Sequence, residues 1–215
     1  MLNDGSEAPH GTIQPPAHGH TAPPGRVGPN AITRVGEALD ALYGRATTHA
    51  VFADAGLTGY LDAWPHEMVD EREVAALNRA LHAALPGDSF RQVTRDAGRR
   101  TGDYLLAHRI PKPVQAVLRP APAWLAGRVL LKAIERHAWT FAGSGTFAAT
   151  AGPPVTVTIV NCPLCHDIRA DTPVCDTYTA TFERLFRELV SPRAQATETA
   201  CQATGAPACR FEIRW

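Results

Sequence analysis

The residues of this chain that could do chemistry gather near its C-terminal end. All five cysteines lie between positions 162 and 209, together with the carboxylate Glu198. Thiolates and carboxylates are ligands of Zn²⁺, whereas a free thiol can also be a nucleophile or a small buried apolar group. An odd number of cysteines, in a chain expected to be cytoplasmic, argues against a disulfide framework. Metal binding, reactive thiols and plain burial therefore stay open.

Cys201 and Cys209 flank a predicted turn centred near Gly205. If the hairpin folds symmetrically about this glycine, the two cysteines face each other with Cβ atoms roughly 4.5–5.5 Å apart. Such a pair suits one zinc ion, whose Zn–S bonds are about 2.3 Å. It also suits a disulfide, which a reducing compartment disfavours.

Cys175 and Glu198 are the candidate third and fourth ligands. Cys175 stands at the start of a predicted helix, whose N-terminus favours a thiolate. Glu198 and Cys201 are an odd number of residues apart, so a regular strand would send them to opposite faces. A β-bulge or a strand end would be needed to bring them together.

Cys162 and Cys165 form a competing pair, in the run Cys-Pro-Leu-Cys. Zinc knuckles use this two-residue gap, but the chain has no second pair of the same spacing. The pair could instead be a redox dithiol, although no thioredoxin-like βαβ pattern surrounds it. His137 and His166 could ligate a tetrapyrrole metal or donate protons; helix-end or surface positions are the ordinary alternative.

Aromatic residues offer a second kind of site. Trp124, Trp139 and Phe141 are spread at helical or strand spacing, for which core packing is the ordinary explanation. They could also line an apolar cavity between a helical layer and a sheet.

Hydrophobic spacing indicates the elements that position these residues. It predicts helices over 31–43 with Asn30 as the cap, 47–55, 71–85 with Asp70 as the cap, 89–108 and 123–136. Strands follow over 140–147 and 155–160, then a helix that begins with Pro173 and ends at Ser191-Pro192. Two last strands are predicted over 196–202 and 208–214. This order is typical of an α+β domain with a helical N-terminal part packed on an antiparallel sheet.

Composition narrows the class of protein. The 215 residues suit one domain, and Lys+Arg and Asp+Glu balance at 21 each, so no global field attracts nucleic acid. The sequence shows no secretory signal and no apolar run long enough for a transmembrane segment. We expect residues 1–29 to be a disordered tail, 30–137 a helical region and 138–215 an α/β domain.

The cysteine region resembles the 4-vinyl reductase domain. The resemblance rests on VNCPLCHDIRADTPVCDTYTATFERLFRELV and ETACQATGAPACRFEIRW. From residue 30 onward the chain is similar to the bacteriochlorophyll 4-vinyl reductase proteins of photosynthetic bacteria. The resemblance implies a small-molecule-binding domain. Some related sensors hold a structural zinc through a Cys, a Glu and two further Cys, a pattern that falls here on Cys175, Glu198, Cys201 and Cys209. Cys162 and Cys165 would then lie outside the metal shell, near the mouth of a pocket.

The resemblance also implies chemistry on a tetrapyrrole. The family is named for reducing the 8-vinyl group (4-vinyl in older numbering) of a chlorophyllide precursor, which needs a hydride or electron source. Because this sequence shows no nicotinamide, flavin or iron–sulfur signature, we favour a tetrapyrrole-binding accessory or carrier protein in bacteriochlorophyll biosynthesis. The reductase is the alternative, and a small-molecule sensor module is the second alternative.

In the favoured interpretation, a magnesium tetrapyrrole is the ligand rather than a cofactor. Its expected partners are magnesium-porphyrin intermediates and pathway enzymes, and we expect a homodimer, cytoplasmic or peripheral to photosynthetic membranes. The candidate ligand-contacting residues are Trp124, His137, Trp139, Phe141, Cys162, Cys165, His166 and Tyr178.

Overall fold

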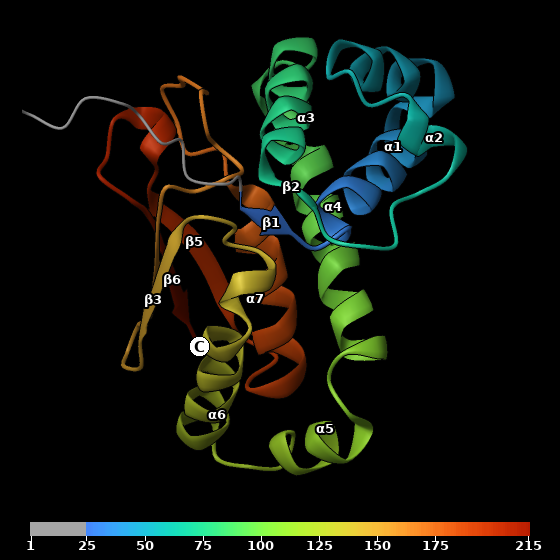
Figure 1. Cartoon of the computed structure of the whole chain (residues 1–215). Coiled ribbons are helices and arrows are strands. Elements are labelled where there is room, and N and C mark those ends of the chain that lie inside the picture. Colours follow the sequence, from blue (N-terminus) through green and yellow to red (C-terminus); the bar gives the residue numbers. More distant parts are fainter. Residues whose placement is uncertain (1–24) are drawn as a thin grey trace, which may run out of the picture.

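The computed structural model of the chain describes residues 25–215, a helical part followed by an antiparallel sheet (Figure 1). The helices α1 (Asn30–Asp54), α2 (Gly59–Asp62), α3 (Glu71–Ala84), α4 (Gly87–His108), α5 (Lys112–Leu118) and α6 (Ala123–Arg136) come first. A 3-10 turn, η1 (Ala138–Thr140), leads to β3 (Thr146–Thr150), β4 (Val155–Val160), α7 (Asp176–Leu189), β5 (Gln195–Ala200), η2 (Gln202–Thr204) and β6 (Cys209–Arg214). The predicted α+β class is confirmed.

The sheet has the strand order β3-β4-β6-β5, and every neighbouring pair is antiparallel. Its two central strands bury alternate residues, so Val157 lies beside Phe211 and Ile159 beside Cys209 on one apolar face. Helix α7 covers this face and α4 packs on the far side of α7, which produces successive layers (Figure 1). The core therefore runs from the sheet through α7 into the helical part.

Glycines in α4 permit this close layering. A Cβ atom at Gly98 would overlap the carbonyl oxygen of Thr177, and one at Gly102 would lie 2.7 Å from Cγ of Arg184. The hydroxyl of Thr181 donates a hydrogen bond to the Gly98 carbonyl at 3.0 Å. Backbone and side chain of α7 thus occupy the space that a larger residue on α4 would need.

Several predicted helix boundaries are corrected by the structure. Residues 31–55 form one element, α1, with a kink where Gly44 has a φ of 78°. Asn30 does not cap it, because the carboxamide oxygen of Asn30 accepts from Nε of Arg34 instead. Asp70 does cap α3, as predicted, by accepting from the Arg72 backbone N–H. Pro173 precedes α7 rather than starting it.

The strand predicted over 140–147 begins only at Thr146. The preceding residues form η1 and a turn in which Gly143 has a φ of 59°. The carboxylate of Glu71, at the start of α3, accepts from the Ser144 N–H at 2.7 Å and from the Gly25 N–H at 3.0 Å. This tie between distant segments replaces the strand ladder there.

The first described residues are also ordered. β1 (Arg26–Val27), which the sequence assigned to the tail, pairs with β2 (Val69–Asp70). The rest of the predicted tail, 1–24, lies outside the described residues. None of the helices within 25–215 is long and apolar enough to cross a bilayer.

Candidate functional site

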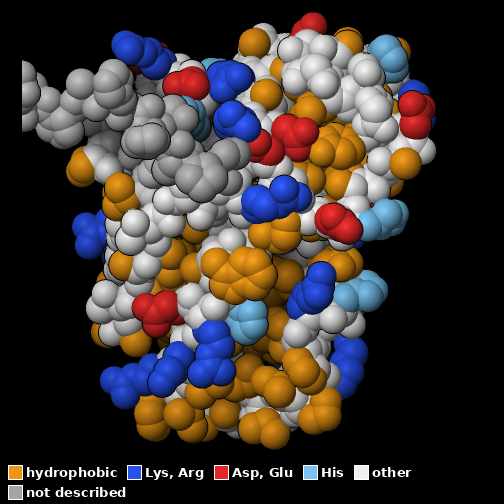
Figure 2. Space-filling model, viewed as in Figure 1, with side chains coloured by type: hydrophobic (Ala, Val, Ile, Leu, Met, Phe, Trp, Pro, Cys, Tyr) orange, Lys and Arg blue, Asp and Glu red, His pale blue; other side chains and the backbone are white. Residues whose placement is uncertain are grey.

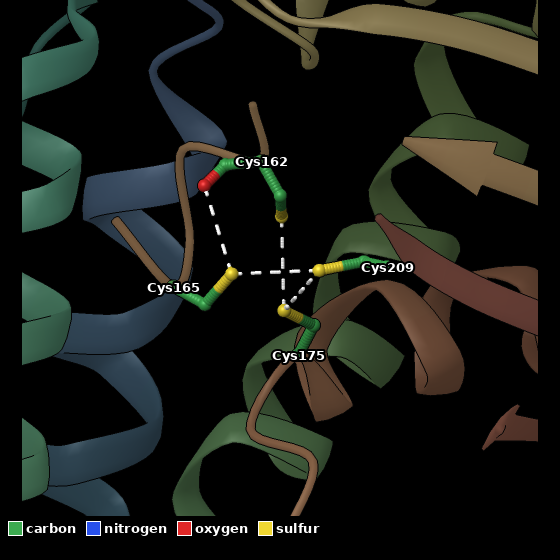
Figure 3. A group of neighbouring side chains, drawn as sticks. All are labelled: Cys162, Cys165, Cys175 and Cys209. Carbon is green, nitrogen blue, oxygen red and sulfur yellow. Dashed lines mark hydrogen bonds between the residues drawn. The ribbon is translucent and has the colours of Figure 1, made fainter. Parts of the chain in front are cut away.

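The five cysteines meet in one buried cluster. Cys162 and Cys165 come from the loop after β4, Cys175 immediately precedes α7, and Cys201 and Cys209 stand at the two ends of the β5–β6 connection. All five thiols are reduced and buried. Figure 3 shows four of them pointing toward a common centre.

Three of the sulfur atoms form a nearly equilateral triangle. The Sγ atoms are 3.8 Å apart for Cys175–Cys201, 3.7 Å for Cys175–Cys209 and 3.8 Å for Cys201–Cys209. A tetrahedral ion with Zn–S bonds of about 2.3 Å separates its sulfur ligands by about 3.8 Å. The triangle therefore has the dimensions of one face of a zinc site.

Glu198 stands where a fourth ligand belongs. One of its carboxylate oxygens lies within 4.8 Å of each of the three sulfurs. Oε2 accepts from the Cys175 backbone N–H at 2.8 Å, whereas Oε1 is buried without a hydrogen-bond partner. Because an unpaired buried oxygen is costly, this atom fits a metal ligand. The predicted donor set can thus hold a metal ion.

A β-bulge gives Glu198 and Cys201 the same side. The pairing of β5 with β6 shifts between Glu198 and Ala200, so Glu198 lies opposite Phe211 and Ala200 opposite Arg210. This is the irregularity that the sequence required for the two residues to act together. The ladder ends before Cys201 and Cys209, whose sulfurs nevertheless approach each other.

Cys162 and Cys165 join the same cluster, which differs from the expectation that they lie near a pocket mouth. Cys162 Sγ is 3.7 Å from Cys175 Sγ, and Cys165 Sγ is 3.4 Å from Cys209 Sγ. The two pairs cross in Figure 3, and these four sulfurs all lie within 4.8 Å of one another. The Cys-x-x-Cys spacing was the sequence signal for this second ligand group.

The thiols of the cluster have unequal acidities. Burial raises the pKa of Cys175 well above its usual value. A hydrogen bond from the Cys165 thiol lowers the pKa of Cys201 to about 6, and one from the Cys162 thiol lowers the pKa of Cys209 to about 5. Two thiolates are therefore available at neutral pH to bind a cation.

The same surroundings act in the opposite direction on the carboxyl group. Burial, followed by the negative charge of Cys201, raises the pKa of Glu198 to about 10. In the absence of a cation this carboxyl group holds its proton at neutral pH. A bound metal ion would displace that proton.

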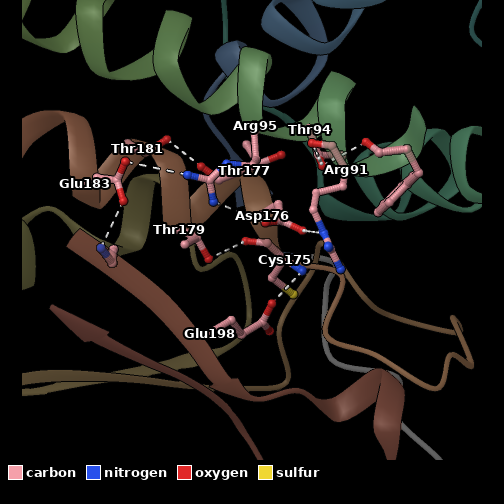
Figure 4. A network of polar contacts seen from close by, with 12 residues as sticks. Arg91, Thr94, Arg95, Cys175, Asp176, Thr177, Thr179, Thr181, Glu183 and Glu198 are labelled. Atoms are coloured by element: carbon pink, nitrogen blue, oxygen red, sulfur yellow. Dashed lines mark hydrogen bonds and ion pairs between the residues drawn. The ribbon is translucent and has the colours of Figure 1, made fainter. Parts of the chain in front are cut away.

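A polar network fixes the segment that carries Cys175 (Figure 4). The adjacent Asp176 forms ion pairs with Arg91 at 3.6 Å and Arg95 at 3.5 Å on α4. On the sheet side, Glu183 of α7 accepts from the Ala196 N–H of β5 at 3.1 Å. The start of α7 is thus held between α4 and the sheet, which sets the position of the Cys175 thiol.

A separate open groove of about 410 Å³ lies between α6, the β3–β4 turn and the end of β6. Trp124 and Trp215 contribute indole rings to it, and Arg128 and Arg214 contribute guanidinium groups. A Cβ atom on Gly127 would lie only 3.0 Å from the Trp215 ring, so this glycine lets the indole lie against α6. The sequence analysis did not single out Trp215, the last residue of the chain.

The other predicted ligand-contacting residues do not gather at this groove. Trp139, His137 and His166 are exposed elsewhere, with His137 Nδ1 2.8 Å from the Ala133 carbonyl oxygen. Phe141 and Tyr178 pack in the core, where the Tyr178 hydroxyl donates to the Phe141 carbonyl at 2.6 Å. Their rings contact those of Phe147, Phe182 and Phe211 between α7 and the sheet. Of the eight candidates, Trp124 alone lines the groove.

Comparisons with known proteins support the resemblance. The 4-vinyl reductase domain family matches residues 155–215. The bacteriochlorophyll synthase 23 kDa chain of Cereibacter sphaeroides is 43% identical over 189 residues, which cover 87% of this chain and 90% of that protein. The protein of the same name from Rhodobacter capsulatus is 37% identical over 188 residues, 87% of this chain and 86% of that one.

Two solved structures share the fold. One is an unliganded Fe(II) H-NOX protein mutant from K. algicida, with a TM-score of 0.55 at 12% identity, covering 87% of this chain and 96% of that one. The other, described as "Modulating Heme Redox Potential Through Protein-Induced Porphyrin Distortion", has a TM-score of 0.51 at 12% identity, covering 88% and 100%. At this identity the likeness concerns the fold alone.

Proposed function

The chain belongs to the bacteriochlorophyll synthase 23 kDa chain family, whose C-terminal part is a 4-vinyl reductase domain, and from this premise we propose that it serves bacteriochlorophyll biosynthesis. Its role there is to bind a magnesium tetrapyrrole and carry it to pathway enzymes. The 8-vinyl reductase activity is the alternative, and a ligand-sensing module is the second alternative.

The groove beside α6 is the observation that carries the carrier function. A chlorophyllide precursor is a flat, largely apolar ring that bears a carboxylate. Trp124 and Trp215 offer aromatic faces for the ring, and Arg128 and Arg214 offer partners for the carboxylate. A volume of about 410 Å³ falls within the usual range for small-molecule sites, and the groove would enclose only part of the ring. Partial enclosure suits a carrier that must release its ligand.

The fold is compatible with such a ligand. One structure of the same fold is described in terms of heme and porphyrin distortion, so this arrangement of helices and sheet is found with a tetrapyrrole in another protein. The 12% identity transfers no binding residue to this chain. The groove is therefore argued from its own side chains.

The cysteine cluster has a structural role in this proposal. A zinc ion held by Cys175, Glu198, Cys201 and Cys209 would join the start of α7 to the β5–β6 hairpin. Zinc supplies folding free energy in such closed sites rather than redox chemistry. Cys175 and Cys209 are fully buried, which suits bracing rather than turnover.

The first test is a titration of the purified protein with a divinyl magnesium-tetrapyrrole precursor, followed by its Soret absorption band. We expect a saturable shift. Replacing Trp124 with Ala should weaken binding roughly 3- to 10-fold through the loss of aromatic contact. Trp139→Ala is the matched control, because this tryptophan is equally exposed, 64% against 62%, but does not line the groove.

Addition of NADPH then separates the alternatives. A bound spectrum that stays unchanged supports the carrier, whereas recovery of the monovinyl product, with a contaminating enzyme excluded, would favour the reductase. No shift at either stage would rule out tetrapyrrole binding and leave the sensor module. Equal weakening by the two tryptophan variants would move the site away from the groove.

We also propose that the protein binds the surface of anionic membranes. The α5–α6 tip (residues 112–129) exposes apolar side chains that nothing covers among the described residues, namely Val114, Val117, Trp124, Leu125 and Val129. Residues 109–136 contain six Lys or Arg against the single acidic residue Glu135, although the whole chain is balanced. Figure 2 shows orange side chains at this end of the molecule with blue ones beside them. Exposed apolar groups flanked by cations suit an anionic lipid surface.

A further inference from the structure

The cysteine cluster contains two groups of four metal-binding residues rather than one. The first is Cys175, Glu198, Cys201 and Cys209, and the second is Cys162, Cys165, Cys175 and Cys209. Cys175 and Cys209 belong to both. We propose that the cluster is a binuclear metal centre in which the thiolates of Cys175 and Cys209 bridge two zinc ions.

The number of donors matches this arrangement. Two tetrahedral ions that share two ligands need six donors in total, two bridging and two terminal on each ion. The described chain supplies six at this place, five thiols and the Glu198 carboxylate. A single ion would leave two donors of the cluster without a metal in a buried position.

The distances are those of two tetrahedra with a common edge. The shared edge, Cys175 Sγ to Cys209 Sγ, measures 3.7 Å. Cys201 completes a triangle with this edge at 3.8 Å from each end. In the second group, Cys162 lies 3.7 Å from Cys175, and Cys165 lies 3.4 Å from Cys209. Both groups therefore approach the spacing of about 3.8 Å that Zn–S bonds of about 2.3 Å require.

Charge gives an independent reason for two cations. Five thiolates and one carboxylate carry six negative charges, which two divalent ions reduce to a net charge of minus two. With one ion, two donors must keep their protons or stay as uncompensated buried charges, which is costly. The orphan Oε1 of Glu198 has the same remedy, because a second ion leaves no donor of the cluster unused.

Other uses of the thiols fit the geometry less well. A disulfide requires an S–S bond of about 2.05 Å, whereas the shortest sulfur pair here is 3.4 Å apart and the thiols are free. A redox-active dithiol also needs access for its partner, but Cys162 and Cys165 are 1% and 3% exposed. The site is closed, as structural metal sites are.

Metal stoichiometry tests the proposal. The full-length protein would be saturated with Zn²⁺, dialysed against a weak chelator and measured by elemental analysis. We expect two zinc ions per chain, and one in the double variant Cys162→Ser/Cys165→Ser. The matched control His166→Ala/Asp167→Ala removes two neighbouring, exposed potential ligands and should keep both ions. One zinc ion per wild-type chain, or iron with inorganic sulfide, would overturn the proposal.

A second measurement needs no variant and so does not depend on the folding of a mutant. The wild-type protein loaded with ¹¹³Cd should give two cadmium resonances, each split by coupling to the other through the bridging sulfurs. In the zinc form, X-ray absorption should show a metal–metal distance of about 3 Å, as expected for ions that share thiolates with bonds of about 2.3 Å. A single resonance, or two without coupling, would contradict the bridged centre. The test involves no tetrapyrrole and is independent of the carrier function.

Discussion

Glu198 occupies a position that disfavours its own charged form. Its carboxyl group is largely buried and stands beside the Cys201 thiolate, so its pKa rises from 4.5 to about 10. A divalent cation reverses this preference, because it attracts both the carboxylate and the thiolate. Metal affinity and metal-free stability should therefore respond oppositely to the removal of this one charge.

The variant Glu198→Gln tests this opposition. A raised folded-state pKa contributes stability that is present below the unfolded value of 4.5 and is lost as pH rises toward 10. After metal removal, the melting temperature of the wild type should therefore fall relative to that of the variant between about pH 5 and 9. Cys201 and Cys209 have lowered pKa values and act in the opposite direction, but both proteins share them.

Calorimetric scans of the two metal-free proteins at several pH values provide the measurement. A constant gap between their melting temperatures would contradict the predicted carboxyl titration. With zinc restored, the order should reverse, since glutamine is a poorer ligand than carboxylate. Competition with a chelator would show the lower affinity of the variant.

The predicted zinc ligands show what single-residue reasoning can reach. Cys201 and Cys209 are eight positions apart around one turn, so local hairpin geometry was enough to pair them. Cys162 and Cys165 reach the cluster only because a loop between β4 and α7 folds back over it. That folding depends on contacts between distant segments, such as the Cys162 N–H with Gln202 Oε1 at 2.8 Å. No local pattern encodes such a contact.

At the scale of elements, the contact between α4 and α7 connects the helical part to the site. Gly98→Ala should weaken it, since the new methyl group would overlap the Thr177 carbonyl oxygen and approach Cβ of Ala180. We expect a loss of about 1–3 kcal/mol, the usual cost of overpacking, seen as a lower melting temperature. Gly59→Ala is the control, because a Cβ atom there meets nothing within 4 Å. Equal stability of the two variants would contradict the tight packing.

Element type was predictable where the apolar spacing was long and regular. The helices ending near His108 and Arg136 and the strand 155–160 were correctly predicted, because burial on one face enforces their period. α5 was missed, since Pro111 and Pro113 were interpreted as breakers although proline suits the first turn of a helix. The strand predicted from residue 140 was displaced by the bond from the Ser144 N–H to Glu71, which is 73 residues away in the chain.

At the scale of the whole molecule, an equal number of acidic and basic residues conceals an uneven distribution. The cations near the α5–α6 tip surround apolar side chains, whereas the metal cluster and the core lie toward the sheet. The groove that we assign to the tetrapyrrole opens beside α6, so its Trp124 belongs to both surfaces. A ligand exchanged with a membrane-associated enzyme would then have a short path. Homodimer formation stays a prediction, which sedimentation can measure.

Membrane contact predicts binding to vesicles that depends on both charge and apolar exposure. The protein should co-sediment with vesicles containing phosphatidylglycerol more strongly than with neutral vesicles, and salt should weaken this binding. Arg128→Glu/Lys132→Glu should reduce binding at least 10-fold, because each cation near an anionic surface contributes about 1 kcal/mol. Val117→Asp should reduce it as well, since this side chain is 70% exposed at the tip. Leu42→Asp, at an exposed apolar residue on α1, serves as the control and should leave binding unchanged. If the tip variants bind like the wild type, or if neutral vesicles bind equally well, the tip is not the membrane contact.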